Sequence, residues 1–214
     1  MSSKRIRLRR LNPDDCQLLC LLNNDEGVMT YLDHEPPSVE DINLEVQHII
    51  DSYTSWPQFG RWIAEGTRGE FLGWFSLAGP KQEMPATLEI GYRLRRQYWG
   101  KGLATEGARL LLDYAFSHNP MVERVIGTTM FVNQRSRHVM EKCGMSHAKT
   151  FFLTFENPLP GTEHGEVLYE ITKEEWKEQQ LQRQPFRPAV AREAAPVEAA
   201  GSYHPDYRGD QSQA

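Results

Sequence analysis

A glycine-containing loop at a strand-to-helix junction is the segment of this sequence best suited to bind a ligand. A strand pattern ends near Arg95, and Gly100 and Gly102 precede a helical pattern that begins at Leu103. Glycine lets the backbone approach a ligand closely, and the free amides at a helix N-terminus attract an anion. The loop could therefore hold a phosphate group. Its spacing is that of neither a P-loop nor a dinucleotide loop, and a tight turn without a ligand explains the glycines equally well.

Strands and helices alternate on both sides of this loop and must position it. Period-two alternation of apolar and polar residues predicts strands, and apolar residues at helical spacing predict helices. Ser38 is suited to cap a helix N-terminus, and Gly144 is suited to the left-handed turn that ends a helix. The predicted strands are 5–11, 59–64, 71–77, 88–95, 122–131, 145–155 and 166–172, and the predicted helices begin after Pro13, at Ser38, at Leu103 and at Asn133.

The composition changes near the C-terminus. The chain has 214 residues and a net charge of −5, which suits one domain with a sizeable core. From Glu178 onward the sequence is rich in Gln, Pro and Ala and has few large aliphatic residues. Such a segment cannot bury enough apolar surface to offset the entropy of ordering. We therefore expect a domain at 5–177 and a disordered tail at 178–214.

Composition also excludes several classes of protein. The mildly acidic balance argues against a general binder of nucleic acids or anionic membranes. No uncharged apolar window reaches the roughly 18 residues of a membrane span, and the basic N-terminus lacks the apolar stretch of a signal peptide. Cys16, Cys20 and Cys143 fit buried thiols in a reducing compartment better than a zinc site. The sequence therefore predicts a cytoplasmic protein without a metal ion, nucleic-acid partner or membrane attachment.

Two motifs are similar to those of the GNAT superfamily of N-acetyltransferases. Gln97-Tyr-Trp-Gly-Lys-Gly102 resembles its Gln/Arg-x-x-Gly-x-Gly/Ala acyl-CoA motif, and Asn133-Gln-Arg-Ser136 resembles a helix of the branch that includes the ribosomal-protein alanine acetyltransferases. Met145 departs from the family pattern, which usually has an aromatic residue there. The resemblance covers about residues 5–177. It implies an α/β (α+β) fold class, a GNAT-like acyl-CoA N-acyltransferase fold whose mixed, mostly antiparallel, splayed sheet of about seven strands is flanked by helices.

The resemblance implies acetyl-CoA as cosubstrate, with its pantetheine arm beside the strand that ends at Arg95. Positive charge from Arg93, Arg95, Arg96 and Lys101 would then gather where the CoA pyrophosphate binds, although solvated surface cations explain these residues equally well. For Asn133, a plain helix N-cap is an equally good explanation. The implied cofactor-binding residues are Tyr92, Leu94, Gln97, Tyr98, Gly100, Lys101, Gly102, Leu103, Ala104, Asn133 and Ser136.

The implied reaction requires a base, an oxyanion donor and an acid. An amine with a pKa near 10.4 is only about 0.04% deprotonated at pH 7, a penalty of roughly 4.6 kcal/mol that a base can relieve. Glu89, which alternates with the apolar positions of its strand, is the first candidate for the base, with His164 and Glu166 as weaker ones. A backbone amide near Tyr92 could stabilise the oxyanion. Ser136, or second Tyr169, could protonate the CoA thiolate, although a helix hydroxyl and a core aromatic explain these two residues as well.

The leading hypothesis is direct acetyl transfer to a primary amine of a small molecule or a protein N-terminus, by a monomer or a homodimer. No Cys/His or Ser/His/Asp arrangement suggests a covalent enzyme intermediate. The acceptor site should be lined by 28–32, 56–59, Trp74 and 151–159, whose aromatic residues could also be core. A non-catalytic acyl-CoA-binding sensor and an O-acetyltransferase remain as alternatives.

Overall fold

The computed structural model describes residues 1–32, 35–79 and 86–183. These residues form one compact unit, Met1–Arg183. Among them, no helix is long and apolar enough to cross a membrane. The elements in chain order are β1 (Arg7–Arg10), a 3₁₀ turn (Pro13–Asp15), α1 (Cys16–Asn23), α2 (Glu26–Met29), α3 (Val39–Ser55), β2 (Gly60–Glu65), β3 (Phe71–Ala78), β4 (Thr87–Leu94), a 3₁₀ turn (Arg96–Tyr98), α4 (Leu103–His118), β5 (Arg124–Met130), α5 (Gln134–Lys142), β6 (Ser146–Phe151), a 3₁₀ turn (Thr162–His164), β7 (Glu166–Thr172) and α6 (Lys173–Arg183).

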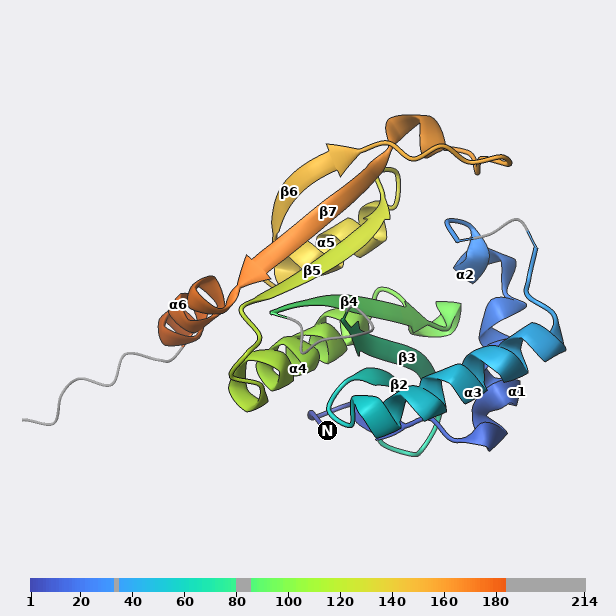
Figure 1. Cartoon of the computed structure of the whole chain (residues 1–214), viewed down its shortest axis with the longest axis horizontal. Coiled ribbons are helices and arrows are strands. Elements are labelled where there is room, and N and C mark those ends of the chain that lie inside the picture. Colours follow the sequence, from blue (N-terminus) through green and yellow to red (C-terminus); the bar gives the residue numbers. More distant parts are fainter. Residues whose placement is uncertain (33–34, 80–85, 184–214) are drawn as a thin grey trace, which may run out of the picture. The chain divides into compact units, whose positions relative to one another are not determined.

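The strands form one mixed sheet in the order β1-β2-β3-β4-β5-β7-β6. All neighbouring pairs are antiparallel except β4 and β5, which run parallel. The β4–β5 pairing comprises only Thr87↔Arg124, Leu88↔Val125 and Glu89↔Ile126. Beyond Glu89 the two strands diverge, so that β5, β7 and β6 lean away from β4 (Figure 1). The expected mixed, splayed, seven-stranded sheet is therefore confirmed.

Local sequence signals explain where several helices begin and end. Ser38 Oγ accepts a hydrogen bond from the Asp41 amide at 3.1 Å, which gives α3 the expected N-terminal cap. Gly144 has a φ of +88°, as expected for the residue that turns the chain after α5. These observations confirm both caps that the sequence predicts.

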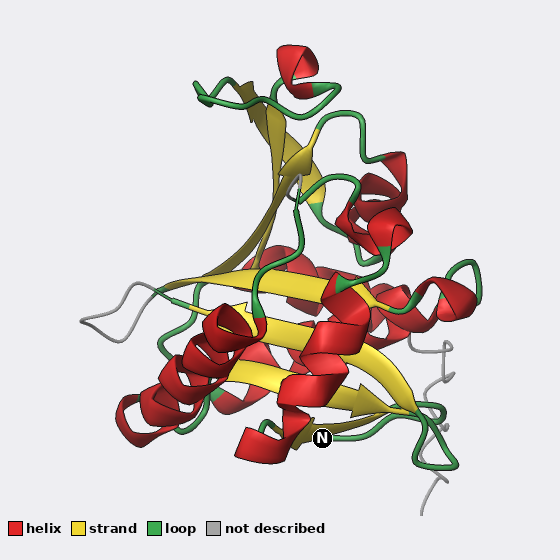
Figure 2. Cartoon of the chain, turned by 90° about the vertical axis from the view of Figure 1, so that its right-hand side faces the viewer, coloured by secondary structure: helices red, strands yellow, loops and turns green. Residues whose placement is uncertain are grey.

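Two apolar clusters cover the two faces of the sheet. One packs α4 and α5 against residues such as Phe75, Leu88 and Ile90. The other packs α1 and α3 against Ile63 and Trp74, and Figure 2 shows helices crossing in front of this face. Because successive strand residues point to opposite faces, the two faces of β4 meet different layers of the protein. This division determines which residues of β4 can meet the same ligand.

Close packing of α4 on the sheet makes Gly107 a sensitive position. A Cβ added there would lie 2.2 Å from Cζ of Phe75, a side chain that is fully buried. The free-energy cost of this overpacking exceeds the free energy that alanine gains over glycine in a helix. Gly107→Ala should therefore destabilise the fold by about 2 kcal/mol. Urea unfolding would measure the loss. The change Ser117→Ala, at an exposed position of the same helix, is the control. Full stability of Gly107→Ala would contradict the tight contact, and Phe75→Leu should relieve part of its effect.

The domain extends further than the sequence suggests. The expected boundary at residue 177 falls inside α6, which continues to Arg183. Trp176 Nε1 donates to Asp113 Oδ1 at 2.9 Å, and Gln179 Nε2 donates to the Gly144 carbonyl at 2.9 Å. These contacts to α4 and to the end of α5 hold a helix with few apolar residues. The remaining part of the predicted tail, 184–214, lies outside the described residues.

Candidate functional site

The divergence of β4 from β5 leaves one edge of β4 open. From Ile90 to Leu94, β4 pairs with β3 on one side, and no other described strand pairs with it on the β5 side. Unpaired strand edges present backbone N–H and C=O groups that another extended chain can pair with. The stretch around Tyr92 and Leu94 can therefore accept a linear, amide-containing ligand.

The loop after β4 presents free backbone amides. Gly100 and Gly102 have φ values of +72° and +74°, a conformation that favours glycine. Within the described chain, the amides from Gly100 to Ala104 have no hydrogen-bond acceptor. Trp99 Nε1 donates to the Leu94 carbonyl at 2.7 Å and ties the loop to the strand. This set of free amides at a helix N-terminus suits a phosphate or pyrophosphate group.

The N-terminal segment compensates the negative charge of the acidic residue in the first turn of α4. Glu106 forms an ion pair with Arg5 at 2.6 Å and accepts from Ser3 Oγ at 2.8 Å. Burial opposes ionisation of Glu106, but the hydrogen bonds from Ser3 and Arg5 outweigh it and lower its pKa. The carboxylate is therefore turned toward Arg5, and the amides at the start of the helix keep their attraction for an anion.

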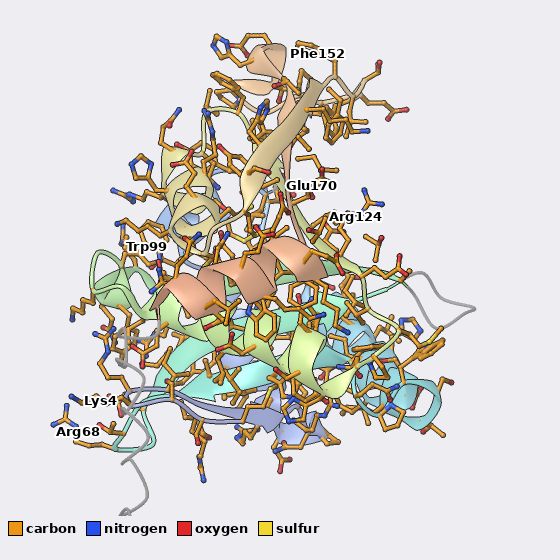
Figure 3. The ribbon with its side chains drawn as sticks, turned by 90° about the vertical axis from the view of Figure 1, so that its left-hand side faces the viewer. Lys4, Arg68, Trp99, Arg124, Phe152 and Glu170 are labelled. Carbon is orange, nitrogen blue, oxygen red and sulfur yellow. The ribbon has the colours of Figure 1, made fainter. Side chains whose placement is uncertain are left out.

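Cations surround the loop, although not all those that the sequence suggests. Lys101 Nζ lies 5.6 Å from the Tyr98 ring centroid, and the Arg135 guanidinium lies 4.9 Å from that of Trp99, which Figure 3 labels. Arg96 pairs with Asp25 at 3.5 Å. Arg93 does not join this group, because its side chain points to the opposite face of the sheet and donates to Asn23. The expectation that Arg93 meets the pyrophosphate is therefore wrong.

Two hydroxyl groups meet at the open edge on the α5 side. The Tyr92 hydroxyl lies 3.0 Å from both the carbonyl oxygen and Oγ of Ser136. Burial raises the pKa of Tyr92, which therefore stays a neutral phenol at physiological pH. Asn133 fixes the start of α5, because its Oδ1 accepts from the Ser136 amide at 3.2 Å and its Nδ2 donates to Thr129 at 3.1 Å. The side-chain contact between Tyr92 and Ser136 adds to the backbone role that the sequence suggests for Tyr92.

A carboxylate lies on the opposite face of β4. Glu89 is exposed, and its Oε1 accepts from Thr128 Oγ1 at 2.6 Å. By strand alternation, Glu89, Gly91 and Arg93 share the face that meets α1 and α3, whereas Tyr92 points toward α5. A carboxylate and a pair of hydroxyl groups therefore lie on opposite faces of β4, close to the point where it separates from β5.

Comparison with known proteins identifies this arrangement. A family model described as "Acetyltransferase (GNAT) domain" matches residues 5–146. The chain belongs to the GNAT acetyltransferase family. It is therefore an N-acetyltransferase, and acetyl-CoA is its acetyl donor. The free amides from Gly100 to Ala104 and the open edge of β4 fit that cosubstrate.

Individual relatives of this acetyltransferase extend over most of its length. It is 37% identical to the "FsC-acetyl coenzyme A-N(2)-transacetylase" of Aspergillus fumigatus over 89% of this chain and 85% of the relative. It is 29% identical to the putative ribosomal N-acetyltransferase YdaF of Bacillus subtilis, over 82% of this chain and 95% of that one. The fold is similar to that of spermidine N-acetyltransferase from Vibrio cholerae in complex with CoA and spermine, with a TM-score of 0.67, 19% identity and coverage of 82% and 99%.

The other acid–base candidates of the acetyltransferase lie in different settings. Tyr169 is 2% exposed, and its hydroxyl donates to Glu141 at 2.8 Å and accepts from Arg137 at 3.3 Å. His164 is exposed, and its ring lies 6.1 Å from that of Phe131 in a tilted arrangement. Burial raises the pKa of Glu166. The environment of Tyr169 is that of a core residue whose hydroxyl is already hydrogen-bonded within the protein.

The face expected to receive the acceptor is partly apolar. Val28, Met29 and Trp74 are buried beside α1 and α2, whereas Tyr31 and Leu32 are exposed. Phe152, Leu153 and Phe155 are also exposed, and Figure 3 shows Phe152 at the far end of the β6–β7 pair. Phe59 instead packs into the core beside α4. Of the 56–59 turn, the structure therefore places Phe59 in the core, and the rest of the expected acceptor lining stays a prediction.

In the part of the chain that the structure describes, no group of three or more His, Cys, Asp or Glu residues could hold a metal ion. None of the three cysteines, all of which the structure describes, forms a disulfide bond, and Cys16 and Cys143 are buried.

Proposed function

We propose that this acetyltransferase moves the acetyl group directly to a primary amine, with Glu89 as base and Ser136 as acid. The observation that carries the proposal is that these groups lie on opposite faces of the sheet, Glu89 at the last residue pair of β4 with β5 and Ser136 beside Tyr92 of the open stretch. The relative whose printed name specifies N(2) supports nitrogen, rather than oxygen, as the acceptor atom. Acetyl-CoA supplies an activated thioester when bound, and the residues of this chain manage charge and protons around it.

Each group has a separate task. The amides from Gly100 to Ala104 hold the pyrophosphate, and the open edge of β4 orients the pantetheine arm. Glu89 removes the proton that the attacking amine must lose. A β4 amide near Tyr92 stabilises negative charge on the thioester oxygen, an effect worth about 3–4 kcal/mol in comparable sites. Ser136 gives a proton to the departing thiolate and regains one from solvent, while the Tyr92 hydroxyl stays protonated and holds Ser136 in place through its 3.0 Å contacts.

The proposal is tested by following thiol release from acetyl-CoA with a panel of primary amines and matched alcohols. We expect release with amines and little with alcohols, and mass spectrometry should find the acetyl group on nitrogen. Equal release with alcohols would favour O-acetyl transfer. Binding of acetyl-CoA without turnover of any acceptor would instead identify a sensor, and it would overturn the proposal.

Removing the two hydroxyl groups should slow the chemical step without unfolding the protein. We expect Ser136→Ala to lower kcat by about 10²-fold, the lower range for general acid catalysis, with little change in the KM for acetyl-CoA. Tyr92→Phe should have a smaller effect. The double variant should lose less than the product of the two single effects, because the groups act as one unit. Steady-state kinetics on the three variants would measure this coupling.

Tyr169→Phe is the matched control for the loss of a hydroxyl. Because the Tyr169 hydroxyl is bonded to Glu141 and Arg137, its removal should cost about 1 kcal/mol of stability and leave kcat nearly unchanged. A larger loss of kcat in Tyr169→Phe than in Ser136→Ala would transfer the acid role to Tyr169.

A further inference from the structure

Arg93 is a partly buried cation for which the described residues supply no anion. Its Nη1 donates to Asn23 Oδ1 and lies 3.7 Å from Met29 Sδ, and both of these partners are neutral. No carboxylate of the described chain forms an ion pair with it. Burial and, to a smaller extent, repulsion from Arg61 lower its pKa to about 10, against a weaker attraction from Glu45. A buried cation without an ion-pair partner is unfavourable. A negatively charged ligand that paired with Arg93 would offset this cost.

Arg61 is a second cation on this face, and it has an ion-pair partner within the protein. Arg61 stacks on Trp74 at 4.1 Å and pairs with Glu45 at 2.7 Å. Arg93 stacks on the same ring at 5.3 Å without such a carboxylate. Arg93 and Arg61 therefore both contact one indole ring, but Glu45 forms an ion pair with Arg61 alone and attracts Arg93 only from a longer distance.

The free donors of Arg93 are open to a ligand. In the described residues, every fully buried side-chain nitrogen or oxygen atom has a hydrogen-bond partner. The Nε and Nη2 groups of Arg93, which have no protein partner among these residues, therefore reach solvent. A guanidinium presents such donors as a planar fork that matches the two oxygens of a carboxylate.

Arg93 also shares a face with the proposed base. Glu89, Gly91 and Arg93 follow one another at alternate positions of β4, so that Arg93 lies about 7 Å from Gly91 and about 13 Å from Glu89 along the strand. α2, whose Met29 contacts Arg93, lies beside the C-terminal end of β4 (Figure 1). An acceptor with its amine near Glu89 and Gly91 would extend toward Arg93.

We infer that Arg93 binds a carboxylate of the acceptor, and that the preferred substrates are amines carrying a carboxylate several bonds from the nitrogen. This inference rests on the proposed N-acetyl transfer and specifies its substrate class. A carboxylate fits better than a phosphate dianion, because the second guanidinium at this place, Arg61, is already paired with Glu45. The acceptor then lies with its cationic end at Glu89 and its anionic end at Arg93.

The test uses ω-amino acids of increasing length, each paired with the alkylamine of the same chain length. The unmodified enzyme should prefer the amino acid of at least one intermediate length by about tenfold or more in kcat/KM. Arg93→Gln should lower kcat/KM for that amino acid by about 10- to 100-fold, the range for a charged hydrogen bond, and change it little for the alkylamine. Comparing the loss on each substrate cancels differences in intrinsic amine reactivity.

Control variants separate recognition from structural support. Arg93→Lys keeps the charge without the fork and should recover part of the preference, and Arg61→Gln, at the paired guanidinium on the same indole, should retain it. The KM for acetyl-CoA should be unchanged in all three variants. Thermal unfolding would verify that each variant is folded.

Three results are distinguishable. No preference for carboxylates at any length, or an equal loss of activity on both substrates in Arg93→Gln, would overturn the role of Arg93 and leave the proposed function in place. A preference that Arg93→Gln does not reduce would assign recognition to another group and would also overturn it. Failure of every amine to release thiol would overturn the proposed function, and this inference with it.

Discussion

Replacing Glu89 with glutamine is expected to lower kcat/KM for the amine by about 10²–10⁴-fold at pH 7, the usual range for loss of a general base. The amide keeps the shape of the side chain and can still contact Thr128, which donates to Glu89 at 2.6 Å. It cannot remove a proton from the incoming amine. The KM for acetyl-CoA should stay close to that of the unmodified enzyme, because Glu89 lies outside the segment from Gly100 to Ala104 that we propose to hold the pyrophosphate.

The pH dependence makes this prediction specific to proton removal. The fraction of an alkylamine that is already deprotonated rises about hundredfold between pH 7 and pH 9, from about 0.04% to about 4%. The rate of the Glu89→Gln variant depends on that fraction. The rate of the unmodified enzyme depends on it less, because Glu89 can remove the proton. The gap between their rates should therefore narrow as the pH rises. Initial rates over this range would measure it.

Two other carboxylates serve as controls. Glu170 lies in one row with Glu89 across the sheet through Ile126. It pairs with Arg124 at 3.2 Å, and Figure 3 labels both residues. Glu170→Gln should leave the rate nearly unchanged. Glu166→Gln tests the alternative base, whose pKa burial raises. A loss in Glu89→Gln that is the same at every pH, or a larger loss in Glu166→Gln, would contradict the assignment of Glu89.

Short-range patterns in the sequence were sufficient to predict most of the fold. Alternation of apolar and polar residues predicts β1 and β4, aromatic-rich runs joined by a turn predict β2 and β3, and a run of β-branched residues predicts β5. The strand at 145–155 is shorter than expected and ends at Phe151, since no strand partner pairs with the residues beyond it in the described chain. α2 has four residues, too few to show a helical period, and it depends on a cap from Asp25.

Contacts between distant residues account for what the sequence could not predict. α6 has little amphipathic pattern, and side chains such as Trp176 and Gln179 hold it to α4 and to the end of α5. The loop with Gly100 and Gly102 could be recognised in the sequence because its residues are consecutive. The contact of Tyr92 with Ser136 joins residues 44 positions apart, and the stacking of Arg93 on Trp74 depends on the register of β3 with β4. Alternation along β4 places Arg93 on the same face as Glu89. This signal could have distinguished Arg93 from the cations expected near the pyrophosphate, such as Lys101.

Introducing a negative charge at Gly102 should raise the KM for acetyl-CoA by about 100-fold. Gly102 precedes α4 with a φ of +74°, and it lies among amides that have no acceptor in the described chain. At roughly 5 Å and an effective dielectric constant near 20, an added carboxylate would repel each unit of phosphate charge by about 3 kcal/mol. The change Gly102→Asp places that charge where the pyrophosphate should bind. Kinetics and direct binding of CoA would measure the loss.

Gly102→Asn separates charge from backbone strain. Asparagine and aspartate have nearly the same shape, and both tolerate the left-handed conformation better than other residues with a side chain. A negative group near the start of a helix is favourable for the helix itself. Gly102→Asp should therefore be at least as stable as Gly102→Asn in thermal unfolding, although it binds CoA far more weakly. Equal CoA affinity in the two variants would show that the pyrophosphate does not bind at these amides, and the position of the cosubstrate would have to be sought elsewhere along β4.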